Sequence, residues 1–145
     1  MVSGEPDRRA IVRRDGFQKL KVWQKAHVMS LDVHRVAGQI RGAKHASLRS
    51  QIIRAAMSPT NIVEGCGQQS SREFSRFLRI ALNSTSELEY HLLAARDLKA
   101  VRPSDSLTLI SQVIEIRKML YGLLRYLASR VEEGGGVTPK AASHA

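Results

Sequence analysis

The chain has 145 residues, 43% of them hydrophobic, which is the size of one domain with its own core. Its 23 Lys and Arg residues outnumber its 13 Asp and Glu residues, and the resulting charge of +10 favours an anionic partner such as nucleic acid. The single cysteine, Cys66, excludes an internal disulfide framework and is typical of a reducing cytosol. No apolar run approaches the roughly 20 residues that span a bilayer, and no signal peptide is evident. We therefore expect a soluble, cytoplasmic protein that binds no membrane.

The first half of the chain predicts an arm and two helices. Residues 1–16 are basic and lack periodicity, so we expect a disordered N-terminal arm. From Leu20 the apolar residues recur at steps of four and three, which predicts a first helix over residues 20–40. The same spacing over residues 48–65 predicts a second helix. We expect a kink in it at Pro59, because proline lacks the backbone donor that a helix interior needs.

The second half of the chain predicts two longer helices. Ser70 or Ser71 is expected to cap a third helix over residues 72–99. Its apolar seam is a seven-residue repeat with two polar interruptions, Ser84 and His91; the apolar members are Phe74, Phe77, Ala81, Leu88, Ala95 and Leu98. After a turn at Pro103, with Ser104 or Asp105 as the cap, a broadly apolar fourth helix is expected over residues 106–130. Residues 131–145 are expected to form a disordered tail.

Together these elements predict an all-α fold. No segment shows the two-residue alternation of a strand, and the four amphipathic segments are joined by short loops. We expect an antiparallel up-down-up-down four-helix bundle over residues 17–130. The third and fourth helices carry more apolar residues than one core needs. Because large exposed apolar patches are rare on monomers, this surplus predicts a homo-oligomer, unless loops cover it.

The sequence offers little to catalysis. His27 and His34 lie seven residues apart and form no metal-ligand motif, so we expect no metal and no cofactor. Cys66, between two glycines, is interpreted as an incidental loop thiol. Glu87 is expected to form a structural ion pair, with Arg54 as one candidate partner. A nuclease is the enzymatic alternative, but the sequence lacks an acidic metal-binding cluster, and we expect a protein that is not an enzyme.

Basic residues carry the functional hypothesis. They form three groups, at the start of the first helix, in the first inter-helix loop and along the third helix. The members are Lys19, Lys21 and Lys25; Arg41, Lys44 and Arg49; and Arg72, Arg76 and Arg79. Each group could be an ordinary solvated face. Since the acids are too few to neutralise them, we expect contacts to RNA or DNA phosphates that depend on salt and are poorly sequence-specific.

Four segments carry a resemblance to a known family. They are FQKLKVWQKA at Phe17–Ala26, SQIIRAAMSPTNIVEG at Ser50–Gly65, SREFSRFLRIA at Ser71–Ala81 and STSELE at Ser84–Glu89. In this order and spacing the chain resembles the four-helix bundle proteins encoded by 23S rRNA intervening sequences. The resemblance covers residues 17–130, nearly all of the segment in which helices are expected.

The resemblance implies a small bacterial bundle that assembles as a ring-like homopentamer. Relatives of the family include the accessory protein of diversity-generating retroelements, a basic pentamer that binds nucleic acid and a reverse transcriptase. An interaction scaffold for such a protein partner is therefore the alternative function. The chain departs from the family pattern at Asn83, where glycine is favoured, and at Gln68 and Gln69, where a basic residue is common. The second departure weakens any phosphate-binding role for that loop.

Overall fold

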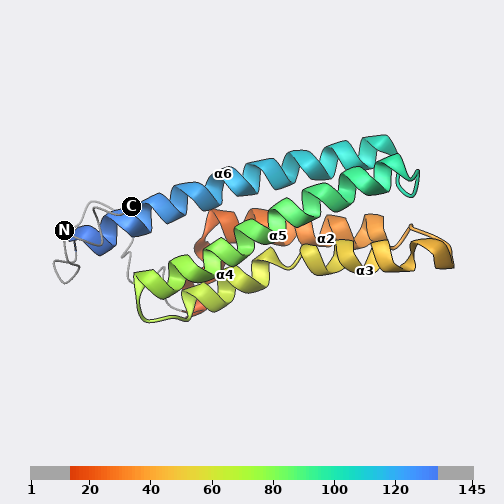
Figure 1. Ribbon diagram of the computed structural model, residues 1–145. Helices are drawn as coiled ribbons and strands as arrows, with labels where there is room; N and C mark the ends of the chain where they lie inside the picture. Colours follow the sequence, from red (N-terminus) through yellow and green to blue (C-terminus); the bar gives the residue numbers. More distant parts are fainter. Residues whose placement is uncertain (1–13, 134–145) are drawn as a thin grey trace.

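The computed structural model describes residues 14–133, and regular structure within them is entirely helical (Figure 1). The elements in chain order are η1 (Arg14–Lys19), α2 (Lys21–Ala37), η2 (Ala43–His45), α3 (Ala46–Ala55), α4 (Ser58–Cys66), α5 (Ser71–Asp97) and α6 (Pro103–Glu133). The all-α prediction is confirmed. Residues 14–16 of the predicted arm belong to η1, and residues 131–133 of the predicted tail belong to α6. The rest of the arm and tail lies outside the described residues.

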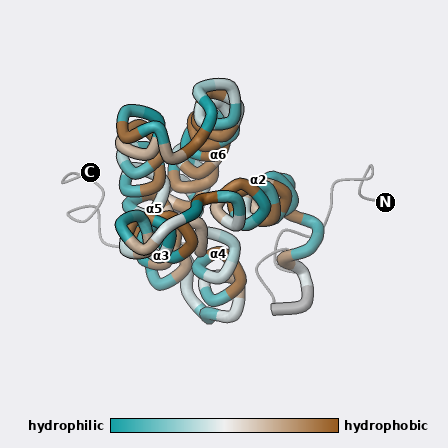
Figure 2. The backbone as a smooth tube through the Cα atoms, turned by 90° about the vertical axis from the view of Figure 1, so that its right-hand side faces the viewer, coloured by the Kyte–Doolittle hydropathy of each residue, from teal (hydrophilic) through white to brown (hydrophobic). Residues whose placement is uncertain are grey.

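The helices pack as a four-helix bundle in which two short helices take the place of one long helix. α6 lies against both α5 and α2, and α5 also packs against α3 and α4. α2 closes the arrangement by contacting α3 and α4, so these two short helices together occupy one position of the bundle. Figure 2 looks along the helix axes and shows α5, α6 and α2 arranged around the core with α3 and α4 below. None of the described helices is both long and apolar enough to span a membrane.

The segment predicted as one kinked helix is in fact two helices. Ala56 and Met57 leave helical geometry, with φ and ψ of −85° and 13° and of −87° and 16°. Pro59 then lies in the first turn of α4, where a missing N–H is tolerated because that donor has no partner within the helix. The proline therefore begins a helix instead of bending one. Ile52 and Ile62 are buried on either side of the break, as predicted.

The buried seam of α5 differs in part from the predicted one. Its members alternate at steps of four and three: Phe74, Leu78, Ala81, Thr85, Leu88, Leu92 and Ala95. The prediction followed only one of the two positions that each heptad buries and took neighbours for the other. Phe77 is only half-buried, and Leu98 is 58% exposed. The buried hydroxyl of Thr85 is satisfied because it donates to the carbonyl of Leu82 at 2.6 Å.

α6 begins earlier than expected and is tied to α5 by a polar contact. Pro103 is its first residue, so Ser104 and Asp105 lie within the first turn and not at the cap. Ser106 is fully buried, and its hydroxyl donates to the carbonyl oxygen of Leu92 at 3.0 Å. This bond, made by a buried hydroxyl, fixes α6 against α5 close to the turn that joins them.

Candidate nucleic-acid interface

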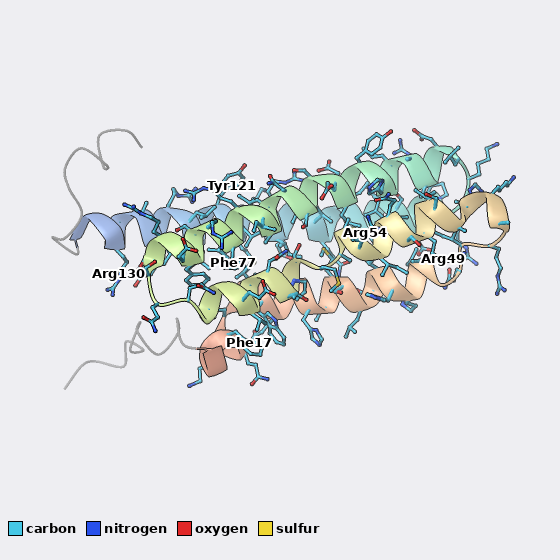
Figure 3. All side chains as sticks on the ribbon, turned by 60° about the horizontal axis from the view of Figure 1, so that its bottom comes forward. Phe17, Arg49, Arg54, Phe77, Tyr121 and Arg130 are labelled. Atoms are coloured by element: carbon cyan, nitrogen blue, oxygen red, sulfur yellow. The ribbon has the colours of Figure 1, made fainter. Side chains whose placement is uncertain are left out.

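The nine predicted basic residues lie toward opposite ends of the bundle. Arg41, Lys44 and Arg49 lie around the α2–α3 connection, whereas the lysines of η1 and α2 and the arginines of α5 lie toward the other end. Figure 3 shows this separation: Arg49 is at one end of the bundle and Arg130 is near the other. A helix of 27 residues such as α5 is about 40 Å long, several times the Debye length of about 8 Å in physiological salt. The basic residues at the two ends of the bundle therefore form separate surfaces.

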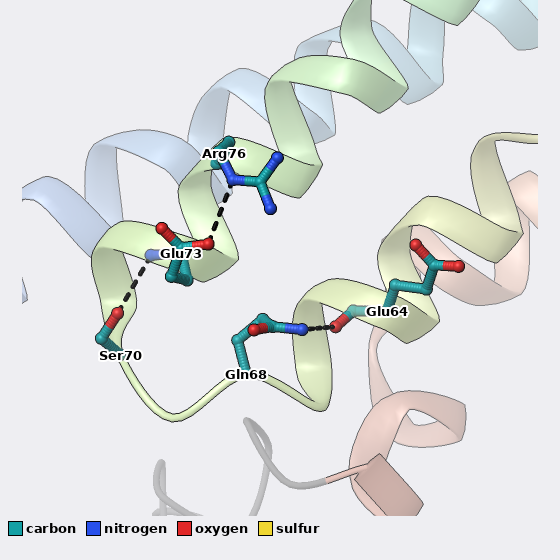
Figure 4. A network of polar contacts seen from close by, with 5 residues as sticks. All are labelled: Glu64, Gln68, Ser70, Glu73 and Arg76. Atoms are coloured by element: carbon teal, nitrogen blue, oxygen red, sulfur yellow. Dashed lines mark hydrogen bonds and ion pairs between the residues drawn. The ribbon is translucent and has the colours of Figure 1, made fainter.

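The start of α5 is a well-capped helix terminus in which one arginine is already partnered (Figure 4). Ser70 accepts a hydrogen bond from the backbone N–H of Glu73 at 3.1 Å, which confirms the predicted cap. Arg76 donates to the Glu73 carboxylate at 3.0 Å and lies 4.6 Å above the ring of Phe77. Arg72 and Arg79 are exposed and make no ion pair with any described residue. Within residues 14–133 this surface thus offers two guanidinium groups without an ion pair.

Glutamine in the preceding loop has a structural role. The side-chain amide of Gln68 donates to the backbone carbonyl of Glu64 at 3.1 Å and so satisfies one of the last carbonyls of α4 (Figure 4). The loop is engaged in ending one helix and starting the next, which agrees with the absence of a basic residue there.

The lysine group is also partly neutralised. Lys25 of α2 pairs with Glu115 of α6 at 3.5 Å, with both side chains half exposed. Lys19 and Lys21 are exposed at the junction of η1 and α2 and have no ion pair within residues 14–133. Such exposed lysines contribute charge to this end but form no defined site.

Arg49 supports the fold and is not a free cation. Its guanidinium is part-buried and donates to the carbonyl oxygen of Ile40 at 2.9 Å, which ties α3 to the chain leaving α2. The prediction of Arg49 as a phosphate ligand is weakened by this bond. Arg41 and Lys44, in contrast, are exposed and unpaired among the described residues.

Three cations that the sequence interpretation overlooked lie at the same end of the bundle. Arg96, Lys99 and Arg102 follow one another at steps of three through the α5–α6 turn. They line a hollow of about 710 Å³, whose other lining residues are Val36, Gln39, Ala100, Val101 and Pro103. Since Val36 lies in the last turn of α2 and Gln39 follows that helix, the hollow adjoins the α2–α3 connection. Figure 1 shows that this connection and the α5–α6 turn lie at the same end of the bundle. The regular spacing of the three cations beside a proline turn was the available signal.

We call this surface the basic end and define it by its exposed cations, Arg41, Lys44, Arg96, Lys99 and Arg102. Residues 96–105, which supply three of them, also contain two acids, Asp97 at the end of α5 and Asp105 in the first turn of α6. Asp97 pairs with its neighbour Arg96 at 3.1 Å. The other four cations make no ion pair with any described residue, so no described carboxylate neutralises them.

Lys99 has a backbone conformation that usually selects glycine. Its φ is +61°, in the left-handed region, and it follows the last turn of α5. The N–H of Ala100 bonds to the carbonyl of Ala95 at 2.8 Å, and the N–H of Lys99 bonds to that of Arg96 at 2.9 Å. These two bonds form a Schellman motif, in which Lys99 occupies the position that glycine prefers. A non-glycine residue there costs about 1 kcal/mol, and strain of this kind clusters at functional sites.

Nucleophilic and metal chemistry find little support in the described residues. Cys66 is the last residue of α4 and is buried, which corrects its expected place in a loop. Burial raises the pKa of Cys66 to about 12 from its ordinary 9.0, so the thiol stays protonated near neutral pH. His27 stacks on Trp23, with ring centroids 4.9 Å apart. Within residues 14–133 no three His, Cys, Asp or Glu side chains gather as a metal site would require.

The prediction that Glu87 forms a structural ion pair is wrong, because a neighbouring glutamate forms it instead. Glu87 is exposed, and so is Arg54, its expected partner. Glu89, two positions on, instead forms the ion pair, with Arg117 of α6, and both side chains are largely buried. Two residues along a helix turn a side chain by about 200°, and this rotation brings Glu89 to the side that faces α6.

An apolar stripe runs along the outside of α6. Leu107, Ile114 and Tyr121 are 68%, 38% and 50% exposed. They are spaced by seven residues, close to two helical turns, so they share one side of the helix. On α5, Ile80 and Tyr90 are also exposed, as expected for residues outside its buried seam. Within one chain, the described residues thus leave this stripe exposed.

Comparison with known proteins agrees with the fold and with the motifs. The model of one family, described as 23S rRNA-intervening sequence protein, matches residues 18–122. A search of curated proteins gave no match. The matched segment extends from η1 into α6 and includes the break before Pro59 and the α5–α6 turn. The chain therefore belongs to the family of 23S rRNA-intervening sequence proteins.

Proposed function

We propose that this protein is a non-enzymatic, homo-oligomeric bundle that binds RNA or DNA through phosphate-backbone contacts, mainly at its basic end. The observation that carries the proposal is that five exposed cations from two inter-helix connections share this end, with three of them lining one hollow and four making no ion pair among the described residues. The buried, protonated thiol of Cys66 supports the non-enzymatic part, since it removes the one cysteine as a nucleophile. We place the protein in the cytoplasm, where a lone thiol stays reduced.

The charge at this end predicts how binding depends on salt. Each Lys or Arg that neutralises a phosphate releases condensed counterions, so the logarithm of the binding constant falls by about 0.7 to 0.9 per contact for each unit of log salt concentration. Four or five contacts then give a slope of about −3 to −4.5. Contacts of this kind carry no sequence information, because they involve only the backbone of the nucleic acid.

A matched pair of variants tests which surface binds. We would titrate fluorescein-labelled RNA and DNA with the full chain and measure anisotropy between about 50 and 200 mM salt. Lys99→Ala with Arg102→Ala should weaken binding strongly. Arg72→Ala with Arg79→Ala removes the same charge from the other end and should have a smaller effect. Equal effects, or a larger effect of the second pair, would contradict the assignment to the basic end; no binding even at low salt would refute the function.

The apolar stripe of α6 supports the homo-oligomeric part of the proposal. We propose that successive long helices of the bundle, with α3 and α4 counted as one, alternate in direction. We also propose that copies of the chain associate through Leu107, Ile114 and Tyr121. The ring-like homopentamer implied by the family resemblance is the assembly we expect. Exposed apolar side chains repeated along a helix gain free energy when a second copy removes them from water.

Light scattering coupled to size exclusion tests this assembly. We expect the wild-type chain to elute as an oligomer and Ile114→Glu to elute as a smaller species. The control is Leu31→Glu, which places the same charge on an exposed leucine of α2. A monomeric wild-type chain would contradict self-association and favour the alternative, in which the stripe docks a protein partner such as a reverse transcriptase.

A further inference from the structure

The hollow beside the α5–α6 turn has walls of two kinds. Ala100 and Pro103 line it with apolar surface that stays accessible, since Ala100 is half-buried and Pro103 is exposed. Arg96, Lys99 and Arg102 line the same hollow with exposed, charged side chains. A ligand that fills it must therefore combine an apolar surface with negative charge.

The size of the hollow limits the ligand further. Its volume of about 710 Å³ lies in the range of pockets that hold small organic groups, about 300 to 1,000 Å³. A nucleic-acid duplex keeps its bases stacked inside and presents phosphates on a convex surface, so it can touch the charged rim but not the apolar wall. An unpaired strand exposes both the flat face of a base and the adjoining phosphates.

The strained backbone at the rim is the third observation. The left-handed conformation of Lys99, with φ of +61°, ends α5 and begins the turn that lines the hollow. Glycine would satisfy the same Schellman motif without strain but would bring no charge. The chain thus bears a local cost at a position where a cation lines the hollow.

From these observations we infer that the hollow holds one unpaired nucleotide of an RNA or DNA strand. Its base lies against Ala100 and Pro103, and its adjoining phosphates contact the cations of the rim. The protein therefore prefers single-stranded over duplex nucleic acid. This inference rests on the proposed function and specifies the ligand class at the same surface.

The test compares strand form and hollow volume in the full chain. The probes are a labelled oligouridine of about 16 nucleotides and an RNA duplex of about the same length, titrated at one salt concentration by anisotropy. We expect the wild-type chain to bind the single strand about tenfold more tightly, a difference of about 1.4 kcal/mol in binding free energy. Ala100→Leu fills the hollow without changing charge and should remove this preference while leaving duplex affinity unchanged.

Two further variants keep the result decisive. Ala43→Leu makes the same substitution at an exposed position of the α2–α3 connection, outside the hollow, and should bind as the wild type does. Gln39→Leu, on the α2 side of the hollow, replaces Ala100→Leu if that variant does not fold by circular dichroism. Equal affinity for both strand forms in the wild-type chain would overturn the inference and leave the proposed function intact. Failure to bind either form at low salt would refute both.

Discussion

A Cβ atom on Gly65 would lie 2.6 Å from Cδ1 of Phe74, closer than real Cβ contacts come. The same atom would lie 3.2 Å from Cβ of Phe77. The ring of Phe74 is 1% exposed and cannot swing into solvent. α4 and α5 therefore touch at a point where only glycine fits, and this close approach positions the capped start of α5.

Gly65→Ala should destabilise the protein by about 1–3 kcal/mol, because overpacking forces the core to shift. Alanine favours a helix over glycine by up to about 1 kcal/mol, so the steric cost is partly offset. Urea denaturation followed by circular dichroism measures the net change. The control is Gly67→Ala, at an exposed residue with φ of −80°, which should change stability little. A Gly65→Ala variant as stable as its parent would show that α4 can move away from α5 freely.

Much of the fold followed from the spacing of apolar residues, but the break before Pro59 did not. The stripe continues from Ile52 to Ile62 across the break, so periodicity alone cannot distinguish one bent helix from two. The outcome depends on Ala56, which is fully buried and adopts a non-helical ψ of 13°. Burial of that kind is set by packing against the other helices and has no local sequence signal.

Arg49→Ala should lower the free energy of unfolding by about 1–2 kcal/mol, because it leaves the carbonyl of Ile40 without its charged donor. Arg41→Ala removes the same charge nearby and should change stability by less than about 0.5 kcal/mol, since Arg41 is exposed. Urea denaturation of both variants distinguishes the structural arginine from the free one. Equal stability of the two variants would contradict the structural role of Arg49.

The candidate site could be predicted only in part. Arg41 and Lys44 were found because they lie close together in the sequence. Arg96, Lys99 and Arg102 belong to the other inter-helix connection and join them only because both connections lie at one end of the bundle. Which cations an internal partner engages, as Glu73 engages Arg76, depends on rotamers that the sequence does not reveal.

Cys66 should make stability depend on alkaline pH. Its thiol pKa is about 12 in the folded chain and 9.0 ordinarily, so above pH 9 the unfolded chain loses a proton that the folded chain keeps. The unfolded state is thereby favoured, and stability falls by about 1.4 kcal/mol per pH unit until the folded thiol also titrates. Because other groups titrate there too, the measured quantity is the difference between wild type and Cys66→Ala in urea denaturation from pH 8 to 11. A constant difference over that range would contradict the shifted pKa.

Lys99→Gly should separate stability from binding. Glycine adopts the left-handed conformation without strain, so the variant should be as stable as the wild type or more stable by up to about 1 kcal/mol. It loses one cation of the basic end, so affinity for RNA or DNA should fall and the salt slope should decrease by about one. Lys44→Gly is the matched control: it removes a charge at the same end but places glycine in the helical turn η2, where it should destabilise the fold slightly. Urea denaturation and anisotropy on both variants measure the two effects. A loss of stability in Lys99→Gly would show that the lysine is held there by contacts that outweigh its strain, and unchanged affinity would remove Lys99 from the interface.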